Sequence, residues 1–136
     1  MAPEFNYSDL LPIGPDESEY RFLGKEGVEV VEAAGRTFIT VSAEAITKLT
    51  EEAIHDINHY LRPAHLQQLR NIIEDKDASA NDRFVALDLL KNANISAGGI
   101  LPMCQDTGTA LVMAKKGQNV FTQSKDEEVI SKGIYN

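Results

Sequence analysis

Three consecutive stretches between Ser42 and Ala97 carry apolar residues in patterns that suit helices, and these patterns limit the fold more than any other feature of the 136-residue chain. Ser42 suits the N-cap of the first stretch, and Pro63 suits the first turn of the second. Ser79, three residues before Asp82, forms the acidic version of a capping box before the third. The sequence therefore predicts three successive helices. Their apolar positions are Ile46, Leu49, Ala53, Ile57 and Tyr60, then Leu66, Leu69, Ile72 and Ile73, then Phe84, Val85, Leu87, Leu89, Leu90 and Ala93.

The apolar positions of the third stretch form a wide band rather than a narrow stripe. A helix with such a band needs partners on more than one side to remove it from water. We therefore expect the third helix to be well buried.

Strands are predicted ahead of the helices. Residues 19–24, 27–35 and 36–41 are rich in the β-branched and aromatic side chains that suit a pleated surface. Ala34-Gly35 is a suitable turn between the last two of these segments. The simplest interpretation is a small antiparallel sheet.

After the third helix, Gly98-Gly99 can supply the left-handed residue that ends a helix. Residues 110–122 read as two strands of a β-hairpin joined near Gly117, and residues 125–136 read as a terminal helix. The predicted fold class is α+β: small antiparallel strands followed by a three-helix segment, then a β-hairpin and a terminal helix.

The terminal helix has Val129, Ile130 and Ile134 on its apolar side and runs to Asn136 without a cap. This pattern is typical of a chain cut short at its C-terminus. At the other end, residues 1–19 contain Pro3, Pro12, Gly14 and Pro15 and predict an extended segment. This segment is part of an acidic front, because residues 1–32 hold eight Asp and Glu against two Lys and Arg. We expect two parts, residues 1–19 and residues 20–136.

Composition excludes several classes of function. The net charge of -8 would repel a phosphate backbone, so nucleic acid is not an expected partner. No apolar run approaches the roughly 18 residues that a membrane helix needs. The N-terminus has the character of neither a signal peptide nor a transit peptide, which indicates an intracellular, cytoplasmic protein. A single cysteine cannot form an internal disulfide.

That cysteine, Cys104, lies in the run PMCQDTGTALVM, followed by an amide, a carboxylate, hydroxyls and a permissive glycine. Such a mixture is typical of a loop at a functional site. A nucleophilic thiol would need one of His55, His59 or His65 as its base. A zinc site would need further Cys or His residues near it in sequence, and an iron-sulfur cluster would need thiolates from elsewhere. An inert cysteine in a tight turn is the remaining alternative.

The run HDINH places His55 and His59 four residues apart on one helical face. It resembles the H-E-x-x-H motif of zinc proteases, but Asp56 stands where that motif has its glutamate. Two histidines do not complete a catalytic zinc site. We therefore interpret them as half-exposed helix residues.

The run PMCQDTGTALV, together with LRPAHLQQL, ASANDRFVALDLLKNANISAGGILP, KKGQNVFT and GIYN, closely resembles the N-terminal part of class I, iron-sulfur-dependent fumarate hydratases. The resemblance extends from about Tyr20 to Asn136. It makes residues 20–136 the N-terminal part of the catalytic domain of an iron-sulfur hydro-lyase.

The resemblance also implies roles for the loop. Cys104 matches the first of three cysteines that hold a 4Fe-4S cluster, so it is the candidate metal and cofactor ligand. Gln105 and Asp106 match the residues that contact bound malate or fumarate, and Asp106 is also the candidate for acid-base catalysis. The open iron of such a cluster can act as a Lewis acid on the C2 hydroxyl of malate.

Members of the family are much longer, and the resemblance places the other two cluster cysteines after Asn136. The 136 residues alone are therefore expected to be inactive and to bind no cluster. The implied parent enzyme hydrates fumarate reversibly to (S)-malate in the tricarboxylic acid cycle, as a homodimer that binds neither nucleic acid nor membrane. It would be cytoplasmic, or mitochondrial in a eukaryote. Two alternatives stay open: a tartrate dehydratase fragment and a non-catalytic helical interaction module.

Overall fold

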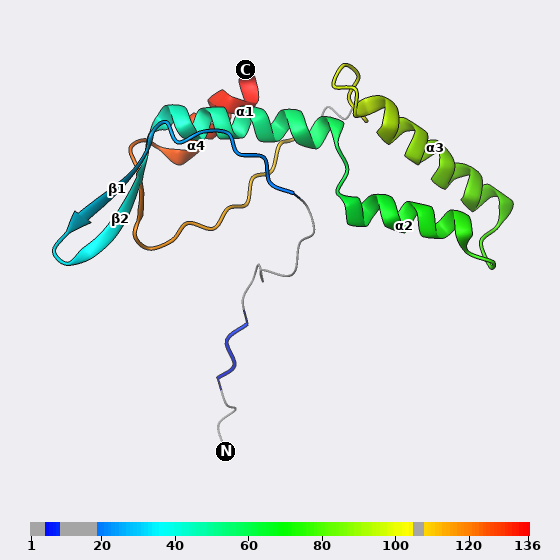
Figure 1. Ribbon diagram of the computed structural model, residues 1–136, viewed down its shortest axis with the longest axis horizontal. Coiled ribbons are helices and arrows are strands. Elements are labelled where there is room, and N and C mark those ends of the chain that lie inside the picture. Colours follow the sequence, from blue (N-terminus) through cyan, green and yellow to red (C-terminus); the bar gives the residue numbers. More distant parts are fainter. Residues whose placement is uncertain (1–4, 9–18, 105–107) are drawn as a thin grey trace.

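The computed structural model describes residues 5–8, 19–104 and 108–136. Figure 1 shows a central helix with a β-hairpin at one end and a helical hairpin at the other. The order of the elements, with strands first and helices after them, confirms the predicted α+β class. The elements are β1 (Val28–Ala33), β2 (Arg36–Val41), α1 (Ala43–His59), α2 (Pro63–Glu74), α3 (Ala80–Ser96), β3 (Val120–Thr122) and α4 (Asp126–Tyr135).

The three predicted helices and their start signals are confirmed. The Ser42 hydroxyl accepts a hydrogen bond from the Ala45 amide at 3.2 Å, and Pro63 is the first residue of α2. Ser79 and Asp82 form both halves of the capping box at the start of α3. These signals act over a few residues of sequence, which explains why they can be found without a structure.

The sheet has the order β1-β2-β3. β1 and β2 pair antiparallel, and the turn between them uses Ala34 at φ 51° and Gly35 at φ 70°. β3 instead pairs parallel with β2, with Ile39 opposite Val120. Phe121 lies against Phe38, with ring centroids 5.7 Å apart.

Two strand predictions are wrong. Residues 19–24 form no strand, and the segment 110–122 contributes the single strand β3 rather than a β-hairpin. In the second case the reason is that β1 pairs with one edge of β2 and leaves the other edge open. The three residues of β3 pair with that open edge. Strand propensity indicates that a segment suits a sheet but does not identify its partner.

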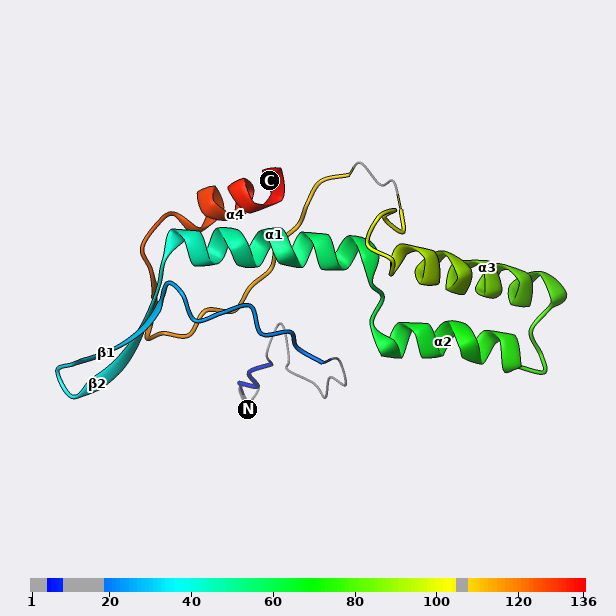
Figure 2. The same ribbon diagram turned by 45° about the horizontal axis from the view of Figure 1, so that its top comes forward.

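Helices α1 and α4 pack side by side, as both views show (Figures 1 and 2). Val129 and Gly133 of α4 are buried against α1, whose Thr50 is buried in return. The hydroxyl of Thr47 also donates to the carbonyl oxygen of Val129 at 3.2 Å. The predicted apolar side of the terminal helix therefore faces α1.

Helices α2 and α3 form the helical hairpin, in which Leu69 of α2 and Ala86 and Ala93 of α3 are buried. The prediction that α3 is well buried is wrong. Among the described residues, its wide apolar band packs mainly against α2, with α1 touching only its C-terminal end, so most of the band faces solvent. The exposed members are Phe84 at 61%, Val85 at 45%, Leu87 at 44% and Leu89 at 46%.

The molecule is open rather than compact. It exposes 11680 Å² of surface, against about 7000 Å² for a compact folded chain of this mass. The segment before β1 nevertheless follows α1, because Arg21 pairs with Glu52 at 2.9 Å and with Asp56 at 3.0 Å. None of the helices in the described part of the chain is long and apolar enough to cross a membrane.

Candidate functional site

Cys104 lies in the segment that follows α3. That helix is closed by Ala97, and Gly99 then turns the chain with a left-handed φ of 73°. This confirms the role predicted for the Gly98-Gly99 pair and assigns it to the second glycine. The thiol of Cys104 is exposed, and the segment meets the C-terminal end of α1 just before it.

Met103, the residue before the cysteine, makes hydrogen bonds through both its backbone amide and its backbone carbonyl oxygen. Its amide donates to the carbonyl oxygen of Asn58 at 2.8 Å, and its carbonyl oxygen accepts from the side-chain amide of Asn92 at 2.8 Å. The first contact has a clear origin. Asn58 is in the last turn of α1, where backbone carbonyls have no partner within the helix.

The Asn58 carbonyl oxygen also accepts a hydrogen bond from the Ser96 hydroxyl at 3.3 Å. Ser96 is buried, with 1% of its surface exposed. The end of α1, the end of α3 and the backbone before Cys104 therefore meet at one carbonyl group.

Gln105 and Asp106, the predicted substrate contacts, lie outside the described residues. They directly follow Cys104 in sequence. Of the three predicted site residues, the structure thus places Cys104 alone.

Among the residues that the structure places, the histidines are not part of a metal site with the thiol. The rings of His55 and His59 stack on each other with centroids 4.4 Å apart, and Nδ1 of His59 contacts the carbonyl oxygen of His55 at 2.8 Å. Within the described ranges, no group of three or more His, Cys, Asp or Glu side chains is arranged to hold a metal ion. The histidines are helix residues, as predicted.

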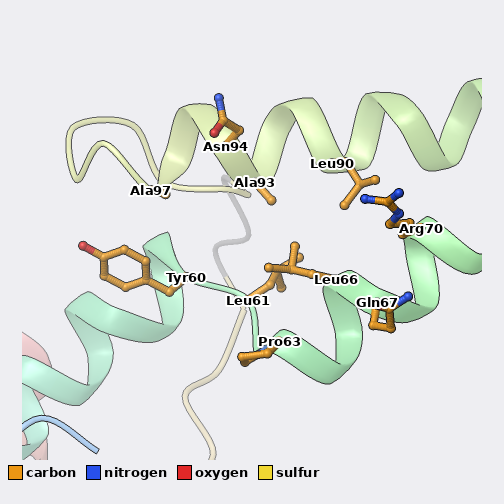
Figure 3. Close-up of a pocket in the computed structure, with 10 residues that line it drawn as sticks. All are labelled: Tyr60, Leu61, Pro63, Leu66, Gln67, Arg70, Leu90, Ala93, Asn94 and Ala97. Atoms are coloured by element: carbon orange, nitrogen blue, oxygen red, sulfur yellow. The ribbon is translucent and has the colours of Figure 1, made fainter. Parts of the chain in front are cut away.

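A cavity of about 540 Å³ lies where the α1–α2 connection faces α3 (Figure 3). Tyr60 and Leu61 form one wall, and Ala93 and Ala97 form the other. Its lining is mostly apolar and does not include Cys104. It is a gap between packed helices, separate from the cysteine.

The donor set of the chain can be tested against a 4Fe-4S cluster. Cys104 is exposed at the end of an anchored segment, which suits one thiolate ligand. The sequence contains no second cysteine, however, and a cluster of this kind needs several thiolates. The 136 residues can therefore supply one thiolate ligand of a cluster but cannot hold a cluster by themselves.

Sequence reasoning missed Asn58, Asn92 and Ser96. The contribution of Asn58 is a backbone carbonyl, for which no sequence signal exists. Asn92 did carry a signal, because asparagine is unfavourable inside a helix unless its side chain has another role.

Comparison with known proteins identifies the family. The sequence model described as "Fumarate hydratase (Fumerase)" matches residues 47–136. "Fumarate hydratase class I, anaerobic" of Escherichia coli (strain K12) is 48% identical over 132 residues, covering 97% of this chain and 24% of the relative. "Fumarate hydratase 1, mitochondrial" of Leishmania major is 46% identical over 138 residues, covering 99% of this chain and 25% of the relative.

These relatives extend well past the matched region, since the chain spans about a quarter of their length. The match to the relatives nevertheless includes almost the whole chain, and the family model matches most of α1 and everything from α2 to α4. The chain therefore belongs to the class I fumarate hydratase family.

Proposed function

We propose that this chain is the N-terminal part of a hydro-lyase that reversibly hydrates fumarate to (S)-malate with a 4Fe-4S cluster. One observation carries the proposal: a chain of this family presents its only thiol, Cys104, exposed beside a backbone anchored to two helices. An inert cysteine would be expected among apolar neighbours, away from solvent.

Cys104 would supply one thiolate to the cluster, and the two other thiolates would come from outside these 136 residues. When bound, the cluster supplies an open iron that acts as a Lewis acid. Gln105 and Asp106 would contact the substrate next to Cys104. Asp106, as a carboxylate, is also able to accept or return a proton.

The chain alone is expected to be inactive, because one thiolate does not hold the cluster. In the parent enzyme, residues 1–19 would be an outer acidic segment, and residues 20–136 the first part of the catalytic domain. We further propose a homodimeric parent that is cytoplasmic, or mitochondrial in a eukaryote, and that binds neither nucleic acid nor membrane.

The experiment uses the longest natural polypeptide that contains this segment. After anaerobic reconstitution with iron and sulfide, fumarate hydration is measured for this parent, for its Cys104→Ser variant and for the 136-residue chain. Activity in the parent alone is the expected result. A serine hydroxyl is a poor substitute for a thiolate toward iron, so the variant should lose the cluster and nearly all activity.

Two results would contradict the proposal. A parent that takes up iron, leaves fumarate untouched and removes water from tartrate would be a tartrate dehydratase. A parent that takes up no iron would contradict the cluster and would favour a non-catalytic interaction module.

A further inference from the structure

We propose that Asn92 is a positioning residue for Cys104: its side-chain amide fixes the Met103 peptide and thereby the direction in which the chain presents the thiol. The inference rests on the proposed function, because the thiol needs a fixed direction only if it is a cluster ligand.

The geometry of Met103 supports this role. Its amide and its carbonyl oxygen are both engaged at 2.8 Å, the first by the Asn58 carbonyl oxygen and the second by the Asn92 side chain. A residue held at both polar groups of its backbone cannot change its dihedral angles without breaking one of these bonds. The carbonyl that Asn92 holds belongs to the peptide unit that ends at the Cα of Cys104. Asn92 therefore acts one peptide away from the thiol.

The two anchors come from different helices. Asn58 is in the last turn of α1, and Asn92 lies on α3, one turn before its end at Ser96. The Ser96 hydroxyl donates to the same Asn58 carbonyl oxygen that receives the Met103 amide. A change at Asn92 thus alters the loop at the point where α1 and α3 are joined.

The chemistry of this contact requires a donor at position 92. Asparagine offers two N–H groups and can serve a backbone carbonyl, whereas an ionised aspartate of nearly the same shape only accepts hydrogen bonds. Asn92→Asp therefore removes the anchor with little change in volume. Asn94→Asp is the matched control, since it introduces the same charge on the same helix at a residue that lines the cavity instead of holding Met103.

The first measurement is amide hydrogen exchange by NMR on the 136-residue chain. In Asn92→Asp we expect the Met103 amide to exchange about fivefold faster than in the original chain, because losing one anchor weakens the other. The amides in the middle of α1 and α3 should keep their rates, and Asn94→Asp should leave Met103 unchanged. Equal Met103 rates in all three proteins would overturn the inference, as would equal acceleration in both variants.

The second measurement is made on the reconstituted parent. Mutation of a residue that orients a metal ligand without binding the metal itself typically lowers metal affinity or activity by about tenfold or more. We expect Asn92→Asp to lower cluster content and to change the electron paramagnetic resonance spectrum, at an unchanged melting temperature. Asn94→Asp should retain both.

A variant Asn92→Asp with the original spectrum and cluster content would overturn the positioning role while leaving the hydro-lyase intact. A parent without iron would overturn the proposed function, and with it the role of Asn92 in cluster binding, whatever the exchange rates. The two failures are therefore distinguishable.

Discussion

Gly133 of α4 lies against Thr50 of α1 so closely that a side chain at position 133 would not fit. A Cβ atom added to Gly133 would stand 2.6 Å from the Cβ of Thr50 and 2.6 Å from the backbone oxygen of Thr47. The absence of a side chain is what lets the two helices approach. This close approach holds α4 beside the central helix.

The change Gly133→Ala should therefore destabilise the protein. Alanine favours a helix over glycine by about 1 kcal/mol, but forcing an extra methyl group into a packed contact costs about 1–3 kcal/mol. The backbone oxygen of Thr47 cannot move aside alone, so we expect the clash to outweigh the gain. Urea unfolding followed by circular dichroism measures the difference in the free energy of unfolding.

Thr50→Ala supplies the control for this prediction. It removes the Cγ2 of Thr50, which the new methyl would meet at 3.1 Å, but keeps the Cβ, so the double variant should recover a small part of the loss. A Gly133→Ala variant as stable as the original chain would show that α4 does not pack on α1 as described.

The helices could be predicted because their signals are local. Ser42, Pro63 and Ser79 each act on the first turn of the helix that they begin. The turn at Ala34-Gly35 is equally local, and it too was found. Each feature depends on residues within about four positions of one another.

The packing of α1 could not be predicted in the same way. Hydrophobic periodicity selects the face with Leu49 and Ile57, which are 57% and 65% exposed, whereas the helix buries Thr50. Small side chains let two helices approach closely. Gly133, 83 positions after Thr50, therefore decides which face of α1 packs against α4. The parallel pairing of β3 is missed for the same reason, since its partner is far away in sequence.

At the candidate site, the sequence indicated the thiol but not the structure that holds it. Cys104 is found from its polar neighbours, while the Asn58 carbonyl is a backbone group that any residue would supply. The meeting of α1 and α3 at Met103 depends on tertiary structure.

The turn between β1 and β2 gives a second prediction. Both central residues have positive φ, as in the type I′ turns of hairpins, and Ala34 at φ 51° carries a Cβ in a conformation that L-residues disfavour. Ala34→Asn should stabilise the protein by about 0.5–1 kcal/mol, because asparagine tolerates this region. Thermal unfolding measures the change. Ala34→Val is the opposing control and should lower the melting temperature, and the reverse order of the two variants would contradict the described turn.

A third prediction concerns the start of α3. The Ser79 hydroxyl accepts from the Asp82 amide at 3.1 Å, and the Asp82 carboxylate accepts from the Ser79 hydroxyl and amide at 2.7 and 3.0 Å. Ser79→Ala should cost about 1 kcal/mol of stability, as is usual for the loss of an N-cap. Ser131→Ala, the same change on the surface of α4, should cost less. Equal losses would show that the capping box contributes nothing specific.

Arg21 provides the last prediction, which concerns pH. Its hydrogen bond to the Asp56 carboxylate holds the pKa of Asp56 below its ordinary value. Because the folded pKa is the lower one, this pair stabilises the protein above about pH 4, the ordinary pKa of aspartate, and the contribution is lost as the pH falls through the folded value. In Arg21→Gln, NMR titration should show the pKa of Asp56 rising toward that of a free aspartate, because its main partner is gone. The pKa of Asp82 is lowered by Ser79 instead and should not change, which makes it the internal control. An unchanged pKa at Asp56 would show that the segment before β1 is not held on α1 by Arg21.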